Sequence, residues 1–436
     1  MGNAGNALRL DRRQMLAAIA TSALAAGAGA PAFARLSARY PATQALIDGY
    51  VAKGLVPGAI VGIVKPGRFD PTWLTAGQTL FEGGSPVSPS TVWRLYSMTK
   101  PVTGIAVMQQ VAAGKLGIDT PIADIMPEFR RMRVLTDPEK SLESRPAERP
   151  ILVRHLLTHS AGFTYTIAGN GPLETEYRRM GILPMSSAGQ LQPGDAPAPD
   201  LGTYVQRLAR LPLHYEPGTK WRYSVGIDVA GALLERLTGK TLDRVLAEQI
   251  FDPLGMRDTG FWLDAERQRR LAGLYAWVDP KTFKPSGKPF LSDGPARTEF
   301  AQRPAMLAGG AGLVGTAGDY ARFAQMMLNE GLFEGTRLLA RGTARLAMSN
   351  LMERGVLFRD GDGNGAGGRA ILSDAAGAEP ERYRVGTWGW GGAASTLFHV
   401  DPVRGHAVVL MLQSIGNPEG PNEQTFNTAL AADARG

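Results

Sequence analysis

Ser97 and Lys100 are the residues whose types and spacing most directly predict catalysis. They lie three positions apart at the start of a segment with helical apolar spacing, so a helix would place hydroxyl and amine on one face, one turn apart. A neutral amine there can take the proton of the hydroxyl and make its oxygen a nucleophile. Pro101 fits a first helical turn, and the N-terminal end of that helix would stabilise an oxyanion. The pair therefore predicts a nucleophilic serine.

Two more motifs follow in the chain, which matters because Ser97 and Lys100 alone also fit a helix-capping serine and a surface lysine. In residues 216–225, Glu-Pro-Gly-Thr-Lys-Trp-Arg-Tyr-Ser-Val, a Pro-Gly turn leads to Tyr223 just before a predicted helix. In residues 389–394, Gly-Trp-Gly-Gly-Ala-Ala, the glycines precede a predicted strand and allow a backbone to approach a bound substrate closely.

In this order the three motifs resemble those of the beta-lactamase-like serine hydrolases, specifically class C beta-lactamases and family VIII carboxylesterases. Ser97 and Lys100 match the family's Ser-x-x-Lys, and Tyr223 matches Tyr-x-Asn, whose third position differs here. Residues 390–392 align with the third element, which is Lys-Thr-Gly in beta-lactamases and often Trp-Gly-Gly in the esterases. The resemblance spans roughly residues 40–415.

The resemblance implies a two-step acyl transfer. Ser97 would attack an ester carbonyl, Lys100 and Tyr223 would take its proton and return it to the leaving alcohol, and water would then hydrolyse the acyl-enzyme. Which of the two acts first as the base stays open, and both should titrate as one coupled pair, with activity lost on acidification. The backbone N–H groups of Ser97 and Ala393 would form the oxyanion hole. Neither a metal nor a cofactor is needed.

Two departures from the family pattern indicate the substrate class. Beta-lactamases offer the Asn amide of Tyr-x-Asn and the Lys cation of Lys-Thr-Gly to their substrates, whereas this sequence has Val225 and Trp390 at those positions. Together with Gly391 and Gly392, these residues are predicted to bind substrate without a clamp for a carboxylate. We therefore expect a serine carboxylesterase acting on small or short-acyl, uncharged esters, with weak beta-lactam hydrolysis. A class C-like beta-lactamase, a D-amino-acid peptidase and a non-catalytic ligand-binding homologue stay open as alternatives.

The elements that must position these residues indicate an α/β (α+β) fold. Residues 56–64 are typical of a strand buried on both faces, and residues 394–400 and 406–412 of a hairpin. Because these strands come from both chain ends, we expect one antiparallel sheet flanked by helices, with a mostly helical inserted subdomain. Apolar spacing and glycine stops predict helices at 97–113, 151–158, 224–238 and 317–330.

The hydrolase domain is expected to cover residues 35–436. Its α/β part would comprise about 35–120 and 290–436, and its helical part about 121–289. Segments rich in small residues and proline, at 165–200 and within 355–380, are predicted to be loops that shape the rim of the pocket.

Composition excludes several function classes. The chain has 436 residues, of which 47 are basic and 40 acidic, and it has no cysteine. This rules out disulfides, thiolate metal sites and a cysteine nucleophile. The net charge of +7 is spread without a basic block interleaved with aromatics, so no nucleic-acid partner is expected. The expected partner is a small-molecule ester, and the oligomeric state is not indicated.

Three competing motifs are weak. His155 and His159 have the spacing of zinc ligands, but Leu156 stands where a zincin needs glutamate, so both are interpreted as structural. Residues 360–365 copy the start of an EF-hand loop, yet Ile371 occupies the position of its last glutamate. Glycines in the same stretch satisfy Gly-x-Gly-x-x-Gly, but no helix signal follows, so a mobile loop is predicted there.

Residues 1–34 resemble a twin-arginine export signal. Arg12 and Arg13 precede an Ala-rich apolar stretch, and Ala32-Phe33-Ala34 offers small residues flanking a peptidase cut. Alanine and glycine contribute little apolar area for spanning a bilayer, and no other stretch approaches the ~20 apolar residues that a spanning helix needs. The sequence thus predicts export, cleavage and a periplasmic or secreted protein without stable membrane insertion.

Overall fold

The computed structural model describes most of the chain outside its N-terminus. The described residues are 39–185, 196–278, 285–359, 362–373, 383–417 and 419–434. The export signal predicted for residues 1–34 lies outside them. In these ranges no helix is long and apolar enough to cross a membrane.

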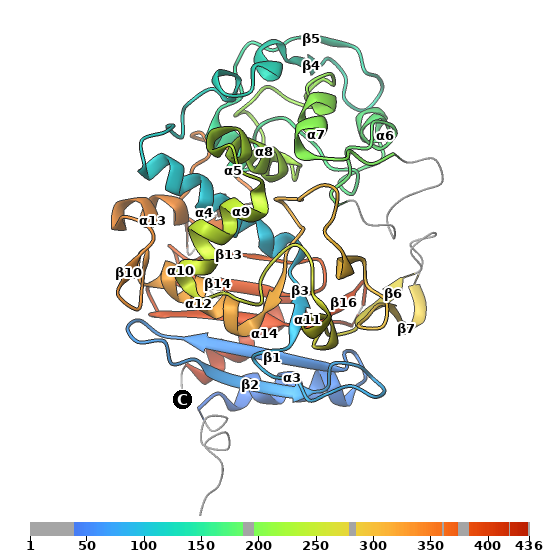
Figure 1. Ribbon diagram of the computed structural model, residues 1–436, viewed down its shortest axis with the longest axis vertical. Helices are drawn as coiled ribbons and strands as arrows, with labels where there is room; N and C mark the ends of the chain where they lie inside the picture. The colour runs from blue at the N-terminus through green and yellow to red at the C-terminus, as the bar shows by residue number, and fades with distance from the viewer. Residues whose placement is uncertain are drawn as a thin grey trace, which may run out of the picture.

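Strands from both ends of the chain form one seven-stranded antiparallel sheet, in the order β11-β12-β13-β14-β15-β1-β2. Ile60 of β1 pairs with Met411 of β15, so the first and last parts of the chain lie side by side, as the blue and red strands of Figure 1 show. This confirms the predicted fold class and the predicted hairpin. The strands are β1 (Gly58–Val64), β2 (Thr72–Gly77), β11 (Asp362–Asn364), β12 (Arg369–Ile371), β13 (Trp388–Gly391), β14 (Leu397–Asp401) and β15 (His406–Met411).

Helices cover both faces of this sheet, which explains why every residue of β1 is buried. Helices α3 (Pro41–Ala52) and α14 (Glu423–Asp433) pack on one face through a small apolar cluster. Their ends are joined because the carboxylate of Asp433 accepts the backbone N–H of Ala42 at 2.7 Å and that of Thr43 at 2.9 Å. Helices α4 (Thr99–Ala112) and α12 (Ala317–Leu328) belong to the larger core on the other face.

Helix α4 is the central helix of the molecule, and it confirms the helix predicted at 97–113. Its residues are mostly small or apolar, and it is buried around almost its whole circumference up to Met108. Pro101 is the third helical residue, where a missing N–H costs nothing. A 3₁₀ turn over Tyr96–Met98 leads into the helix, and Tyr96 has a φ of +44°, which is uncommon for a residue with a side chain.

The inserted part is mostly helical, and its elements from β4 to α8 lie at the top of Figure 1. The predicted helices at 151–158 and 224–238 are confirmed as α5 and α8, and α8 ends where Gly239 takes a φ of +69°. The elements of this part are β4 (Arg133–Leu135), β5 (Ser144–Pro146), α5 (Val153–Leu157), α6 (Pro172–Arg179), α7 (Leu201–Leu208), α8 (Gly226–Thr238), α9 (Leu242–Leu246), α10 (Asp252–Leu254) and α11 (Ala265–Arg269).

Smaller sheets complete the fold. Strand β6 pairs with β16 near the C-terminus, so the chain contacts the C-terminal segment again from about residue 274. Strand β3 pairs with β8 and leads directly to Ser97. The remaining elements are β3 (Val92–Arg94), β6 (Leu274–Val278), β7 (Pro285–Asp293), β8 (Val314–Thr316), β9 (Leu332–Phe333), β10 (Thr336–Arg337), α13 (Arg341–Met348) and β16 (Ser414–Ile415).

Both loop predictions need correction. The segment 165–200 contains helix α6, and within 355–380 the glycine-rich stretch contains the buried strand β11. The glycine of β11 serves close packing rather than mobility, because a Cβ at Gly363 would lie 2.5 Å from the Cγ of Asn350. Residues 360–361 of the EF-hand-like stretch lie outside the described residues.

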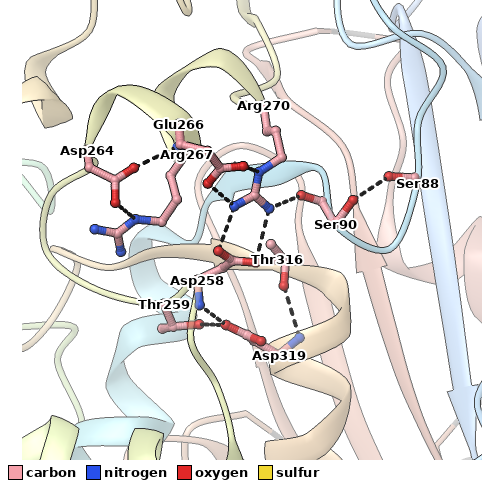
Figure 2. Close-up of polar contacts among 10 residues, drawn as sticks. All are labelled: Ser88, Ser90, Asp258, Thr259, Asp264, Glu266, Arg267, Arg270, Thr316 and Asp319. Atoms are coloured by element: carbon pink, nitrogen blue, oxygen red, sulfur yellow. Dashed lines mark hydrogen bonds and ion pairs between the residues drawn. The ribbon is translucent and has the colours of Figure 1, made fainter.

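A polar cluster holds the segment around α11 against β3 and α12 (Figure 2). The guanidinium of Arg270 donates to Asp258 at 2.6 Å, and the carboxylate of Asp319, in the first turn of α12, accepts the N–H of Asp258 at 2.8 Å. The carbonyl of Arg270 accepts the N–H of Val92 in β3 at 3.0 Å. The cluster therefore supports the strand that positions Ser97.

Candidate active site

The hydroxyl of Ser97 lies within hydrogen-bond distance of both predicted proton carriers. Lys100 Nζ donates to Ser97 Oγ at 3.1 Å, as the helical spacing predicted. The hydroxyl of Tyr223, 126 residues further along the chain, lies 2.6 Å from Ser97 Oγ. Ser97 and Tyr223 are partly exposed, whereas Lys100 is buried. The structure thus brings these three side chains together around one oxygen.

Lys100 is held from its other side by the segment before β8. Its Nζ donates to the carbonyl of Gly310 at 2.7 Å. This segment runs along α4 because the hydroxyl of Thr103 donates to Gly309 O at 2.8 Å and the N–H of Leu313 donates to Thr99 Oγ1 at 3.1 Å. The lysine is therefore fixed at two points, although its side chain is long and flexible.

Asp228 and Tyr165 complete the surroundings of Lys100, and neither was predicted from the sequence as a site residue. The carboxylate of Asp228 accepts the N–H of Gly310 at 2.9 Å and the hydroxyl of Tyr165 at 3.0 Å. The Tyr165 ring centroid lies 5.3 Å from Lys100 Nζ and 5.1 Å from the Tyr223 ring. A side chain at Gly310 would not fit, because its Cβ would lie 2.7 Å from the Tyr165 hydroxyl.

Burial is the main influence on the pKa values of Asp228 and Tyr165. Burial raises the pKa of Asp228, while the nearby Lys100 and the hydrogen bonds from Gly310 and Tyr165 oppose that rise. Burial, with the Asp228 charge, raises the pKa of Tyr165 well above its ordinary value, so this phenol stays neutral and donates its proton. A signal for Asp228 was present in the sequence, since it is the one acidic residue in the otherwise apolar stretch 225–234, five positions after Tyr223.

The two histidines have separate surroundings. His155 Nδ1 accepts the N–H of Leu152 at 3.1 Å, and its Nε2 lies 3.3 Å from the carboxylate of Glu353. His159 Nδ1 instead accepts the N–H of Ser224 at 3.3 Å, and its ring packs 4.9 Å from the Tyr223 ring. Burial, with the charge of Lys100, lowers the pKa of His159 well below its ordinary value, so it is neutral. Within the described ranges no cluster of three or more His, Asp or Glu could hold a metal ion.

The Trp-Gly-Gly segment lies beside the nucleophile. A Cβ at Gly392 would come within 2.5 Å of the carbonyl oxygen of Leu95, two residues before Ser97. The turn after β13 is closed by the N–H of Gly392, bonded to Thr396 O at 2.8 Å. Its exposed residue Ala393 is the predicted second donor of the oxyanion hole.

Aromatic rings surround Tyr223 on its outer side. The ring centroids of Trp390 and Trp221 lie 6.0 Å and 6.2 Å from that of Tyr223, and both rings are stacked nearly parallel to the phenol. Phe358 contacts Trp221 at 4.4 Å and Trp390 at 5.8 Å between centroids. All four rings are partly exposed. We call Trp221, Phe358 and Trp390 the aromatic rim.

Val225, which was predicted from the sequence to bind substrate, lies in the core instead. Its side chain is completely buried in the apolar core, and its N–H donates to Thr164 O at 3.2 Å at the start of α8. An apolar residue is accommodated there because it packs inward behind Tyr223. A direct contact of Val225 with substrate is therefore not supported by this packing, whereas Trp390 and Gly391 are partly exposed.

A cavity of about 220 Å³ lies against β13, and the nucleophile is not among the residues that line it. It is lined by Trp390 and Gly391 and also by Arg369, His399 and Glu423. Neither Ser97 nor Lys100 or Tyr223 lines it. We therefore do not assign it to the reacting part of a substrate.

Known sequences resemble this chain over most of its length. The family model named Beta-lactamase matches residues 43–433. The chain is 34% identical to Esterase EstB of Burkholderia gladioli over 340 residues, which cover 76% of this chain and 79% of that protein. It is 30% identical to Lovastatin esterase of Penicillium rubens over 383 residues, which cover 82% of this chain and 88% of that protein.

Known structures share the fold. The structure titled "EstCE1, a hydrolase with promiscuous acyltransferase activity" superposes with a TM-score of 0.72 at 26% sequence identity. The match covers 93% of this chain and the whole of that one. The similarity therefore includes both the sheet and the helical part.

Proposed function

The chain belongs to the beta-lactamase family, and from this membership and the contacts of Ser97 we propose that it is a serine carboxylesterase that forms an acyl-enzyme on Ser97 and prefers uncharged esters. The observation that carries the proposal is the position of Ser97 Oγ, 3.1 Å from Lys100 Nζ and 2.6 Å from the Tyr223 hydroxyl. A nucleophile with two proton carriers at this distance can be activated and can have its proton returned. The relatives named as esterases support ester hydrolysis.

In the first step Ser97 Oγ bonds to the ester carbonyl carbon, and its proton passes to the Lys100/Tyr223 pair. The carbonyl oxygen becomes an oxyanion that the N–H groups of Ser97 and Ala393 would stabilise. The C–O bond to the alcohol then breaks, and the pair returns the proton to the leaving oxygen. The product of this step is a Ser97 ester and the free alcohol.

In the second step water attacks the Ser97 ester, with the same pair taking a proton from the water. The bond to Ser97 Oγ breaks, the proton returns to that oxygen, and the carboxylic acid leaves. Asp228 acts indirectly in both steps. It accepts the N–H of Gly310, and the carbonyl of Gly310 holds Lys100. No step changes an oxidation state, so the two steps need only the ester and water.

The preference for uncharged esters follows from Trp390. An indole stands where beta-lactamases carry the lysine that binds a substrate carboxylate, and it supplies no cation. The aromatic rim offers apolar and π surface instead. Small or short-acyl esters are therefore the proposed substrates, with weak beta-lactam hydrolysis.

Hydrolysis of p-nitrophenyl butyrate and of a chromogenic cephalosporin, measured side by side, tests this function. The wild type should cleave the ester fast and the cephalosporin slowly, and Ser97→Ala should cleave neither. A faster reaction with the cephalosporin would overturn the substrate preference. If neither compound reacts, a peptidase or a ligand-binding protein becomes the better explanation.

Acyl transfer to an alcohol is a second candidate. EstCE1 is described as a hydrolase with promiscuous acyltransferase activity. Here the partly buried rings of Trp221, Phe358 and Trp390 lie around Tyr223 and favour an apolar acceptor over water. Adding 1-butanol to a reaction with p-nitrophenyl butyrate should yield butyl butyrate beside butyric acid. Formation of butyric acid alone would exclude this activity.

Export of the protein is also proposed, on the basis of Arg12, Arg13 and the Ala-rich stretch that follows. Fractionation of cells that express the full chain tests it. The protein should be found outside the cytoplasm, and Arg12→Lys/Arg13→Lys should keep it inside. Equal distribution of both variants would contradict export by this signal.

A further inference from the structure

Glu174 is a buried carboxylate of helix α6 that the proposed mechanism does not use. Its side chain is 1% exposed, and its Oε1 lies within hydrogen-bond distance of three side chains. The hydroxyl of Thr164 donates to it at 2.5 Å and Arg222 Nη2 at 2.6 Å, and His214 Nε2 lies at 3.0 Å. Three donors on one buried oxygen form a rigid junction.

The three partners of Glu174 come from two segments that carry site residues. Thr164 directly precedes Tyr165, and Arg222 directly precedes Tyr223. Arg222 Nε also donates to Thr164 Oγ1 at 2.9 Å, so the two segments are joined both directly and through Glu174. The junction thus lies one residue away from each of the two tyrosines that contact Lys100 or Ser97.

Space at the junction is limited, which fixes the carboxylate. A Cβ at Gly171 would lie 2.9 Å from Glu174 Oε2, and one at Gly169 would lie 3.3 Å from Arg222 Nη2. Burial opposes the charge of Glu174, but the hydrogen bonds from His214, Thr164 and Arg222 outweigh this and lower its pKa, so the carboxylate is ionised at neutral pH.

We propose that Glu174 is a positioning residue that fixes the Tyr223 hydroxyl at Ser97 by clamping Arg222 to Thr164 from helix α6. This inference rests on the proposed function, because it assigns to Glu174 an effect on the proton transfer by Tyr223. Proton transfer depends steeply on the distance between the oxygens, whereas substrate binding does not depend on this phenol alone. Loss of the clamp therefore lowers kcat and leaves KM nearly unchanged.

The test is a double-mutant cycle of Glu174→Gln and Tyr223→Phe, with p-nitrophenyl butyrate as substrate. Glu174→Gln should lower kcat by about tenfold or more, with KM within about twofold of the wild-type value. In the Tyr223→Phe background the same substitution should have no further effect, because the hydroxyl that it positions is already absent. Thr164→Val, which removes one donor and keeps the volume, should act in the same direction if Glu174→Gln does not fold.

Glu176→Gln is the matched control. Glu176 lies on the same helix, two residues away, and pairs with Arg179 at the surface. Its variant should keep the wild-type kcat. The inference is overturned if Glu174→Gln behaves like Glu176→Gln, or if it lowers kcat equally with and without the Tyr223 hydroxyl. A Tyr223→Phe variant with wild-type activity would instead overturn the role of Tyr223 in the proposed mechanism, on which the inference rests, and would leave ester hydrolysis itself standing.

Discussion

Lys100 and Asp228, the two buried charged residues of the site, bond to the two backbone groups of one glycine, Gly310. Lys100 Nζ donates to the carbonyl of Gly310 at 2.7 Å, and the N–H of Gly310 donates to Asp228 Oδ1 at 2.9 Å. The carboxylate thus acts on the lysine both through its charge and through the position of this glycine. Because the amine also bonds to Ser97 Oγ, the effect of Asp228 reaches the nucleophile.

Asp228→Asn should lower kcat/KM by about ten- to a hundredfold, because it removes the buried charge and replaces an acceptor of the Tyr165 hydroxyl. Steady-state kinetics with p-nitrophenyl butyrate measure this. Asp243→Asn is the control. Asp243 forms a surface ion pair with Arg303, and its variant should keep the wild-type kcat/KM. Wild-type activity of Asp228→Asn would show that neither its charge nor its contact with Gly310 matters.

Trp390→Lys should raise the ratio of cephalosporin to ester hydrolysis by about tenfold, because a cation then stands where an anionic substrate places its carboxylate. Trp390→Phe is the matched control, since it keeps an aromatic ring beside Tyr223 without a charge. Rates with both chromogenic substrates give the ratio. An unchanged ratio in the lysine variant would refute the specificity argument.

Gly392→Ala should lower kcat by about tenfold or more, because the added Cβ would lie 2.5 Å from Leu95 O and would push the turn with Ala393 away from Ser97. Gly391→Ala is milder, since its Cβ would lie 3.2 Å from Thr396 O. Kinetics of the two variants side by side test the second donor of the oxyanion hole. Equal activities would argue against it.

Asp319→Asn should gain stability relative to the wild type as the pH rises from 4 to 7. Burial raises the pKa of Asp319 to about 6, although the hydroxyl of Thr259 and the N–H of Asp258 bond to its carboxylate (Figure 2). Between the unfolded and folded pKa values the folded protein binds more protons, so the wild type loses stability as the pH rises through this window. Asparagine does not titrate. Melting temperatures at several pH values measure the difference.

Asp264→Asn is the control with the opposite sign. The backbone N–H of Arg267 donates to Asp264 at 2.8 Å and lowers the pKa of this carboxyl, so its stabilising effect is present at neutral pH and is lost on acidification. The variant should therefore lose stability relative to the wild type as the pH rises. If both variants follow the same trend, the stability changes do not come from these carboxylates.

The sequence was most informative where local pattern and burial agree. Helix α4 and the β14–β15 hairpin have the apolar periodicity of their elements, and Ser97 and Lys100 are neighbours within one helical turn, so their contact needs no long-range information. The position of Tyr223 at Ser97 could be expected only from the family resemblance, because 126 residues separate the two.

The missed elements depend on contacts between distant segments. Helix α6 is rich in charged residues and short, and its Glu174 is buried only because His214 and Arg222 lie beside it. Strand β11 has no apolar residue, and it is buried through close packing of Gly363 against Asn350. Both stretches are too short for a clear periodic signal, and the partners that bury them are set by the tertiary fold.

The central claim, that Ser97 is the nucleophile, is tested most directly by identifying the acylated residue. Wild type is mixed with p-nitrophenyl butyrate, quenched in acid during the first turnovers and digested for peptide mass spectrometry. A butyryl group on Ser97, absent from Ser97→Ala, is the predicted result. A butyryl group on another residue, or a Ser97→Ala rate within about tenfold of the wild type, would contradict the account.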